Sequence, residues 1–293
     1  MFCLLLSPAL VSAGDKDDFG TWLELGADKA LPHNLSVGLS TELRMQDNST
    51  TVNRWGIGAE LGYKVNKYFK LGASYSFLYG YNADKFKTKV TDHYKDDIVD
   101  DDHWNGYNKV ETFTQSNWVM RHRFNVEANA TVKLGGWLRI SLRERYQYTH
   151  RPEQYENETK TKWKVRYDKV MDGDGNVSYQ LKDEYAEYAG GWMLDYADRQ
   201  ERDTISMSNT HILRTRLKLE VDKKRLAWSP FVSVETQNNL TECMHLTKVR
   251  TMVGTEYKIN KHHSLEAAYV FTCETDEGRQ RLHAVSVGYK FKF

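Results

Sequence analysis

Beyond its first residues the chain alternates apolar and polar positions in blocks of about ten residues, the length of a tilted strand that crosses a membrane. In one block Leu35, Val37 and Leu39 share a parity, and Trp55 and Ile57 share it in the next. The opposite parity holds mainly glycine, serine, arginine, glutamate and lysine. Such a face cannot pack as the core of a soluble sandwich, but it can line a hydrated or ion-paired lumen. The pattern predicts an all-β fold, a single antiparallel transmembrane β-barrel of 10–12 strands.

The connectors between the blocks form a second, independent pattern. Short links at Asn66–Tyr68 and Lys133–Gly136 alternate with long segments near 82–116 and 149–208. Outer-membrane barrels have short periplasmic turns and long extracellular loops. We therefore expect residues 14–293 to form one barrel whose two long segments are outer loops.

The alternation alone does not fix the number of strands. Ten blocks from Leu35 onward alternate properly, and the segment Phe19–Ala30 also resembles a strand. Single-chain bacterial barrels usually have an even number of strands. The sequence leaves open whether Phe19–Ala30 is a strand, a lead-in or a plug.

The N-terminus resembles an export signal. Phe2–Leu6 and Ala9–Val11 are apolar, small residues precede the expected cleavage after Ala13, and a polar stretch follows. We expect residues 1–13 to be a signal peptide and the mature protein to lie in a bacterial outer membrane. No basic region precedes the apolar core, which leaves open a start upstream of residue 1. The alternative is a buried N-terminal strand.

Composition narrows the classes of function. The net charge of +1 gives no basic face for a nucleic-acid partner. Mean hydropathy is −0.69, and a barrel escapes this measure because only alternate residues face lipid. Aromatic residues make up 13% of the chain and there are only four prolines, as long paired strands require.

The polar parity carries many charges of both signs. A short internal repeat supports this arrangement. Residues 119–127 and 212–220 share the pattern apolar-apolar-Arg-x-Arg-apolar-x-apolar-Glu. In a confined interior, arginine and carboxylate groups pair well. We expect a lumen filled by a structural charge network that makes a rigid, plugged strut. The candidate members are Glu42, Arg44, Arg54, Glu60, Arg121, Arg123, Glu127, Arg143, Arg214, Arg216, Glu220, Glu235, Arg250 and Glu256.

Several short motifs together carry a family resemblance. They are Trp22-x-Glu24, Glu42-Leu43-Arg44, the Arg-x-Arg strands, Pro230 five residues before Glu235, and a closing Val-Ser-Val-Gly-Tyr. With these motifs the chain resembles the bacterial family called domain of unknown function 2490. The resemblance spans nearly the whole mature chain and implies an outer-membrane barrel, but no activity.

Candidate chemistry is sparse. Outer-membrane lipid hydrolases place a histidine and a serine two residues apart on the lipid-facing side of a strand, so that the imidazole can activate the hydroxyl. His122, His211 and His283 have the lipid-facing parity, but none is followed by such a serine. The run 172–176 resembles the start of a calcium loop, yet a tight hairpin turn fits it better. We expect no enzyme activity, no metal and no cofactor.

Two further features concern partners and covalent bonds. The chain ends in alternating aromatics that close on Phe293, which resembles the terminal strand recognised by the outer-membrane assembly machinery. Cys243 and Cys273 fall in outer loops of neighbouring hairpins, and a disulfide between them is an open alternative in an oxidising compartment. We expect outer-membrane lipid and lipopolysaccharide to surround the protein, whose oligomeric state the sequence does not indicate.

Three classes of function remain. The first is a structural barrel, or one whose long outer loops bind a ligand or partner, and the sequence favours this class. The second is a small-solute channel, which requires a gap between the lumen charges. The third is a lipid hydrolase, which the missing serine disfavours.

Overall fold

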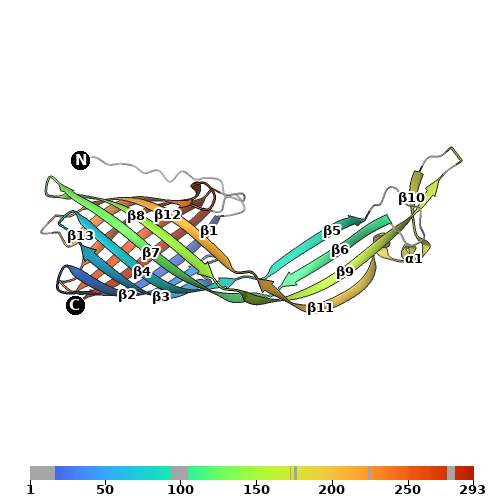
Figure 1. The fold of residues 1–293 in the computed structure, drawn as a ribbon, viewed down its shortest axis with the longest axis horizontal. Coiled ribbons are helices and arrows are strands. Elements are labelled where there is room, and N and C mark those ends of the chain that lie inside the picture. Colours follow the sequence, from blue (N-terminus) through green and yellow to red (C-terminus); the bar gives the residue numbers. More distant parts are fainter. Residues whose placement is uncertain (1–16, 94–104, 172, 175–176, 224–225, 276–280) are drawn as a thin grey trace. The chain divides into compact units, whose positions relative to one another are not determined.

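A computed structural model describes residues 17–93, 105–171, 173–174, 177–223, 226–275 and 281–293. These residues are almost entirely β-structure and divide into two compact units. One unit is a closed barrel, and the other is an open sheet built from residues 82–118 and 153–207 (Figure 1). The prediction of an all-β fold with a barrel is therefore confirmed.

The barrel contains eleven strands, within the expected range. Around the cylinder each strand pairs with the next one in the list, and the last pairs with the first. The strands are β1 (Asp17–Ala30), β2 (Leu35–Gln46), β3 (Thr51–Lys64), β4 (Phe69–Asn82), β7 (Asn117–Leu134), β8 (Leu138–Arg151), β12 (Ser208–Val221), β13 (Trp228–Asn239), β14 (His245–Lys258), β15 (His263–Glu274) and β16 (Arg281–Lys292).

The seam between the two terminal strands is parallel. Asp17 of β1 pairs with Arg281 of β16, and Asp28 pairs with Lys292. The prediction that the barrel is antiparallel throughout is wrong at this seam. When each strand reverses direction relative to the one before it, an odd number of strands leaves the first and last pointing the same way. The segment whose role the sequence left open is thus the strand that closes the barrel.

The other neighbours around the barrel are antiparallel. Between β4 and β7 the direction follows from two contacts. The Thr131 amide donates to the Tyr68 carbonyl at 2.8 Å, and the Asn125 side-chain amide donates to the Ser74 hydroxyl at 2.9 Å. Because the residue number rises along β4 as it falls along β7, these strands also run in opposite directions.

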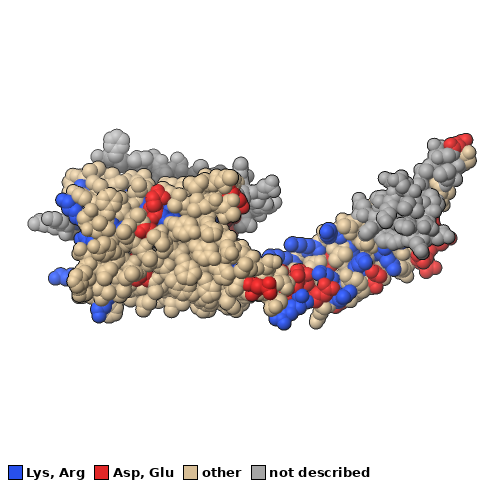
Figure 2. Space-filling view, viewed as in Figure 1, with Lys and Arg blue, Asp and Glu red and all other residues tan. Residues whose placement is uncertain are grey.

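The register places the apolar parity on the outer face. Leu39, Ile57, Val126 and Val253 belong to four different strands, and each side chain is more than half exposed. In Figure 2 most of the visible outer face of the barrel is uncharged, apart from one group of charged side chains near its middle and others at its ends. Inside the barrel Trp22 packs with Val270 and Ala284 in a small buried apolar cluster.

The pairing of β8 with both neighbours is unbroken around Glu144. Glu144 therefore keeps the outward parity of Leu142 and Tyr146 on the same strand. Glu144 accepts a 2.8 Å hydrogen bond from the Thr215 hydroxyl on the adjacent strand. A local partner thus satisfies a carboxylate on the apolar face.

The second unit is a five-stranded antiparallel sheet whose central strand is β9. The strands are β5 (Lys85–His93), β6 (Asn105–Thr114), β9 (Gln154–Met171), β10 (Val177–Leu181) and β11 (Met193–Ile205). A single-turn helix α1 (Asp183–Ala186) and a 3-10 turn (Ala189–Gly191) connect β10 to β11. The two long segments near 82–116 and 149–208 are thus largely regular sheet. Met171 pairs with Val177 across the run expected to be a hairpin turn, of which residues 172, 175 and 176 lie outside the described residues.

Both insertions leave the barrel at the same end of its strands. One joins the end of β4 to the start of β7, and the other joins the end of β8 to the start of β12. At the opposite end the links are short, such as those between β3 and β4 and between β7 and β8. Among the described residues no helix is both long and apolar enough to cross a membrane. The expected signal peptide, residues 1–13, lies outside the described residues.

Candidate functional site in the barrel lumen

The charges predicted from parity gather in the interior of the barrel. A cavity of about 550 Å³ lies there, and a second cavity of about 660 Å³ shares part of its lining. Of the predicted set, Glu42, Arg44, Glu60, Arg123, Arg143, Arg214, Arg216, Glu235, Arg250 and Glu256 line the first cavity, whereas Glu220, Arg143 and Arg216 line the second. The remaining members, Arg54, Arg121 and Glu127, lie on β3 and β7 with the same inward parity.

Glu235 of β13 is the most heavily shared carboxylate of this interior. Its side chain is almost fully buried and lies 2.8 Å from a nitrogen of Arg143 and 2.5 Å from one of Arg214. A third guanidinium, from Arg250, lies 3.6 Å away. Because these arginines belong to β8, β12 and β14, one carboxylate joins four strands. Charge-assisted pairs of this kind are among the stronger polar interactions in a protein.

A second group forms on the opposite flank. Glu42 of β2 lies 3.0 Å from a nitrogen of Arg44 and 2.8 Å from the Nε atom of Arg54. The ring of Trp22 lies beside two guanidinium groups, with Arg44 at 4.1 Å and Arg250 at 4.9 Å from its centroid. A cation over an indole face is attracted by its quadrupole. Trp22 therefore links the Glu42 group to the Glu235 group through Arg250.

Two further ion-paired groups were only partly foreseen. Glu127 pairs with Arg145 across β7 and β8. At the end with short links, Asp222 pairs with Lys133 and Arg139, and Arg139 also pairs with Glu220 at 2.9 Å. The hydrogen bond from Lys133, together with the charge of Arg139, lowers the pKa of Asp222 below its ordinary value. Asp222 was not among the predicted members because it follows the last position of its apolar–polar block.

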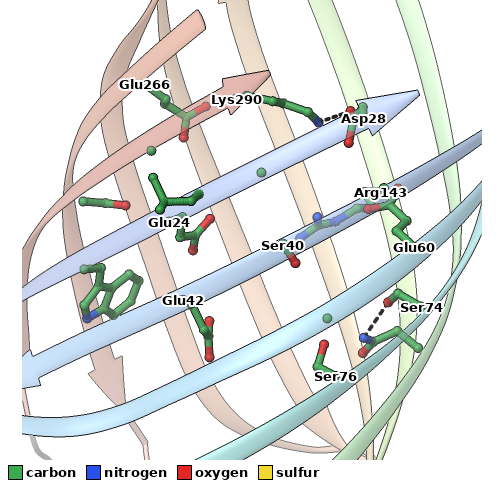
Figure 3. Close-up of a pocket in the computed structure, with 18 of the residues that line it drawn as sticks. Glu24, Asp28, Ser40, Glu42, Glu60, Ser74, Ser76, Arg143, Glu266 and Lys290 are labelled. Carbon is green, nitrogen blue, oxygen red and sulfur yellow. Dashed lines mark hydrogen bonds and ion pairs between the residues drawn. The ribbon is translucent and has the colours of Figure 1, made fainter. Parts of the chain in front are cut away.

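Carboxylates are also concentrated on one wall of the lumen. In the strand register Glu24 lies opposite Glu42, and Glu266 lies opposite Glu256. Gly288 of β16 joins the two pairs, because it faces both Glu24 and Glu266. Figure 3 shows Glu24, Glu42 and Glu266 pointing into the interior from β1, β2 and β15. The parity of β1 and β15 held the signal for Glu24 and Glu266, which the sequence analysis did not include in the network.

The outward-facing histidines have tyrosine partners. The Nδ1 atom of His122 lies 2.8 Å from the hydroxyl of Tyr75, and that of His211 lies 2.7 Å from the hydroxyl of Tyr146. His283 forms the same kind of pair with Tyr269. An imidazole that could activate a serine in a hydrolase is here bonded to a phenol. These pairs could not be predicted from the parity of one strand, because the partners lie on neighbouring strands.

The cysteines are not brought together by a bond. Cys243 is exposed in the turn between β13 and β14, Cys273 is partly buried in β15, and both are free thiols. In the second sheet, oxygens of Glu156, Glu158 and Asp203 lie within 4.8 Å of one another. Exposed acidic groups commonly gather without an ion, and Lys160 already pairs with Glu158 at 3.1 Å. The proximity of these oxygens alone therefore does not indicate a metal site.

The lumen is thus a braced chamber with guanidinium groups in excess on one side and carboxylates on the other. It can resist collapse of the barrel and can hold small charged solutes or water in its cavities. The described residues hold no pairing of a nucleophile with a base at the cavity surface that would indicate a reaction.

Comparison with known proteins gives one result. A family model described as "Protein of unknown function (DUF2490)" matches residues 19–283. No curated protein matches the chain, and no solved structure does.

Proposed function

The chain belongs to the DUF2490 family of proteins of unknown function, and we propose from its own geometry that it is a bacterial outer-membrane β-barrel whose second sheet presents a binding surface. In this proposal the lumen is closed to solute flow by its ion pairs, and the protein has no enzymatic role. Lipid and lipopolysaccharide surround the barrel.

The apolar outer face of the barrel is the observation that best supports a membrane location. Leu39, Ile57, Val126 and Val253 are 55–63% exposed although they are aliphatic. A soluble protein rarely leaves a continuous apolar surface of this extent in water. A closed barrel has no strand edges, so all of its backbone groups can be paired inside a bilayer.

The orientation follows from the connectors. Short links characterise the periplasmic end of outer-membrane barrels, and long insertions characterise the outer end. Because both insertions that build the second sheet leave from one end of the barrel, this sheet belongs outside the cell. The outward-facing Tyr289 and Phe291 lead to the exposed Phe293, which supports recognition by the assembly machinery.

The second sheet has features of a binding surface. Phe86 of β5 lies directly opposite Phe113 of β6, and Val90 shares their face. These three side chains are 66%, 41% and 51% exposed, respectively. Exposed aromatic and aliphatic groups that gather on one face are typical of sites for protein partners or other ligands. Lysines at positions 85, 87 and 89 alternate with these residues and discourage nonspecific pairing along the edge.

One observation favours a small-solute channel as the second candidate. The two lumen cavities share the lining residues Arg143, Arg216 and Lys218, so a rearrangement of these three side chains would join them. The ion pair of Arg143 with Glu235 and that of Lys218 with Glu220 oppose this rearrangement. We therefore place the channel second.

The test uses the full protein in its membrane. We expect it to remain in the membrane fraction after carbonate washing and to migrate faster on gels before heating than after. Purified protein in a planar bilayer is then expected to show no discrete conductance steps. Extraction by carbonate would contradict the membrane location, and reproducible steps would replace the closed barrel by the channel. Release of fatty acid from labelled outer-membrane lipid would contradict the non-enzymatic role.

A further inference from the structure

Arginines outnumber carboxylates in the part of the lumen nearest Glu42, Glu127 and Glu235. Six arginines share these three carboxylates in ion pairs: Arg44 and Arg54 with Glu42, Arg145 with Glu127, and Arg143, Arg214 and Arg250 with Glu235. Three more arginines, Arg121, Arg123 and Arg216, face the same interior. This cluster, called the arginine cluster below, therefore carries a large positive excess.

Arg123 and Arg216, which line the cavity, differ from the six ion-paired arginines in having no ion pair among the described residues. Arg123 of β7 lies within electrostatic range of Arg54, Arg214, Glu42 and Arg44, so most of its near neighbours repel it. Arg216 of β12 lies within electrostatic range of Glu235, Glu266, Glu127 and Arg145, and no ion pair with any of these carboxylates is described. Guanidinium groups remain charged at all physiological pH values, so they cannot relieve this repulsion by losing a proton.

Hydrogen-bond donors in this cluster are also left over. The Nε atoms of Arg123 and Arg143 are buried and have no hydrogen-bond partner in the described structure. A buried donor without a partner destabilises the folded protein, and a charged donor does so more strongly. Both arginines line the cavity of about 550 Å³, so these side chains border a space that can hold a small acceptor.

The guanidinium groups that line this cavity favour one class of ligand. A guanidinium presents a planar fork of donors that matches the oxygens of a phosphate, a sulfate or a carboxylate. An oxyanion of more than one negative charge would offset the repulsion among the arginines and accept their remaining hydrogen bonds. A monovalent halide would offset less charge and could not engage the forks in the same way.

We propose that the arginine cluster is a binding site for a small multivalent oxyanion, of which inorganic phosphate is the simplest, held in the barrel lumen by Arg123 and Arg216. The closed wall separates this site from the outer face of the barrel, so the ligand is a solute that enters along the barrel axis. The site does not depend on the membrane location proposed above.

The test measures thermal unfolding of the detergent-solubilised protein. The readout is gel migration, since the folded form is expected to migrate faster than the heat-unfolded form. At constant ionic strength, replacing chloride with phosphate is expected to raise the midpoint temperature of unfolding, and this increase should saturate as the phosphate concentration rises. Arg123→Gln and Arg216→Gln should each weaken the apparent affinity for phosphate by at least about tenfold, since each removes charge-assisted bonds. Lys87→Gln makes the same change of charge on the exposed edge of the second sheet and should leave the affinity unchanged.

A lipid phosphate is the other source of the same chemistry, and dihexanoyl phosphatidic acid below its micellar concentration tests it. Stabilisation by this lipid without any by inorganic phosphate would overturn the proposal. Equal stabilisation by chloride and phosphate, or undiminished stabilisation in both arginine variants, would also overturn it. The compact gel form is the folded species that migrates faster before heating. If Arg123→Gln does not give this form, the proposal is tested by Arg216→Gln and by the comparison of phosphate with chloride on the unaltered protein.

Discussion

At the scale of single residues, Glu235 has the greatest predicted effect on stability. Replacing it by glutamine in Glu235→Gln removes the charge that Arg143, Arg214 and Arg250 share. Breaking a buried ion pair from one side costs about 3–5 kcal/mol, because the partner charge remains buried. We expect the free energy of unfolding in urea, measured on protein folded into vesicles, to fall by about this amount.

Glu60 provides the matched control in the same lumen. Its pair with Lys70 is 3.5 Å long, and both side chains are about half exposed. Exposed pairs contribute about 0–1 kcal/mol, so Glu60→Gln should change the free energy of unfolding little. Equal losses of unfolding free energy in the two variants would show that the ion pairs of Glu235 stabilise the barrel no more than an exposed pair does.

Parity along the strands was enough to predict which charged side chains face inward, but it could not identify their partners. Arg143 and Glu235 are 92 residues apart in sequence and lie on strands separated by β12. Their meeting depends on the curvature of the closed barrel, which no local pattern encodes. The stacking of Arg44 and Arg250 near Trp22 was unforeseen for the same reason.

At the scale of elements, close packing between neighbouring strands constrains Gly254 of β14. A Cβ atom at this position would lie 2.4 Å from the Ala267 carbonyl oxygen and 2.7 Å from the Ala268 Cα atom. Because these are backbone atoms, the adjacent strand β15 would have to move. Overpacking of this kind typically costs about 1–3 kcal/mol. We expect Gly254→Ala to lower the temperature at which the protein loses its compact gel form.

Gly288 of β16 is the control for that substitution. The nearest atom to a Cβ there is the Glu266 Cβ at 3.7 Å, an ordinary contact. Gly288→Ala should therefore leave the transition temperature close to that of the unaltered protein. A larger effect at Gly288 than at Gly254 would contradict the described packing of β14 against β15.

The stability of the second sheet is expected to depend on pH through Asp195 and Lys160. Hydrogen bonding to Lys162 lowers the pKa of Asp195, so its contribution is present above the unfolded value of about 3.9 and disappears as the pH falls through the folded value. Hydrogen bonds to Glu201 and Glu158 raise the pKa of Lys160 to about 12. Its contribution is present below about 10.4 and is lost as the pH rises through about 12.

Hydrogen exchange of peptides from β9 and β11, corrected for intrinsic rates, measures this dependence. Protection should stay constant between about pH 5 and 9 and decrease under stronger acid or base. Asp195→Asn should reduce the acid-dependent loss, whereas Asp183→Asn, at an exposed carboxylate for which no ion pair is described, should not. Identical acid profiles in the two variants would contradict the role of Asp195.

The elements themselves were predictable to different degrees. The barrel strands could be predicted because each has one apolar and one polar face, which gives an alternating pattern in the sequence. In β9 the run Thr159-Lys160-Thr161-Lys162 is polar on both faces, so the expected alternation is missing and the segment resembles a loop. The closing role of β1 was also hidden, because a parallel seam leaves no trace in the sequence of one strand.

At the scale of the whole molecule, the proposed membrane location requires the outer face of the barrel to contact lipid. Family membership, the strand number and the alternation of apolar and charged rows are all compatible with this location. A measurement at the outer face itself tests this location directly.

That measurement is the accessibility of a nitroxide label in the protein reconstituted into lipid vesicles. Labels at Leu39→Cys and Phe86→Cys, in a background with the native cysteines replaced, compare two equally exposed positions, at 63% and 66%. The account predicts that oxygen relaxes the label at position 39 strongly and a water-soluble nickel chelate relaxes it weakly, with the opposite result at position 86. If the chelate reached both labels equally, the outer face of the barrel would lie in water and the account would be contradicted.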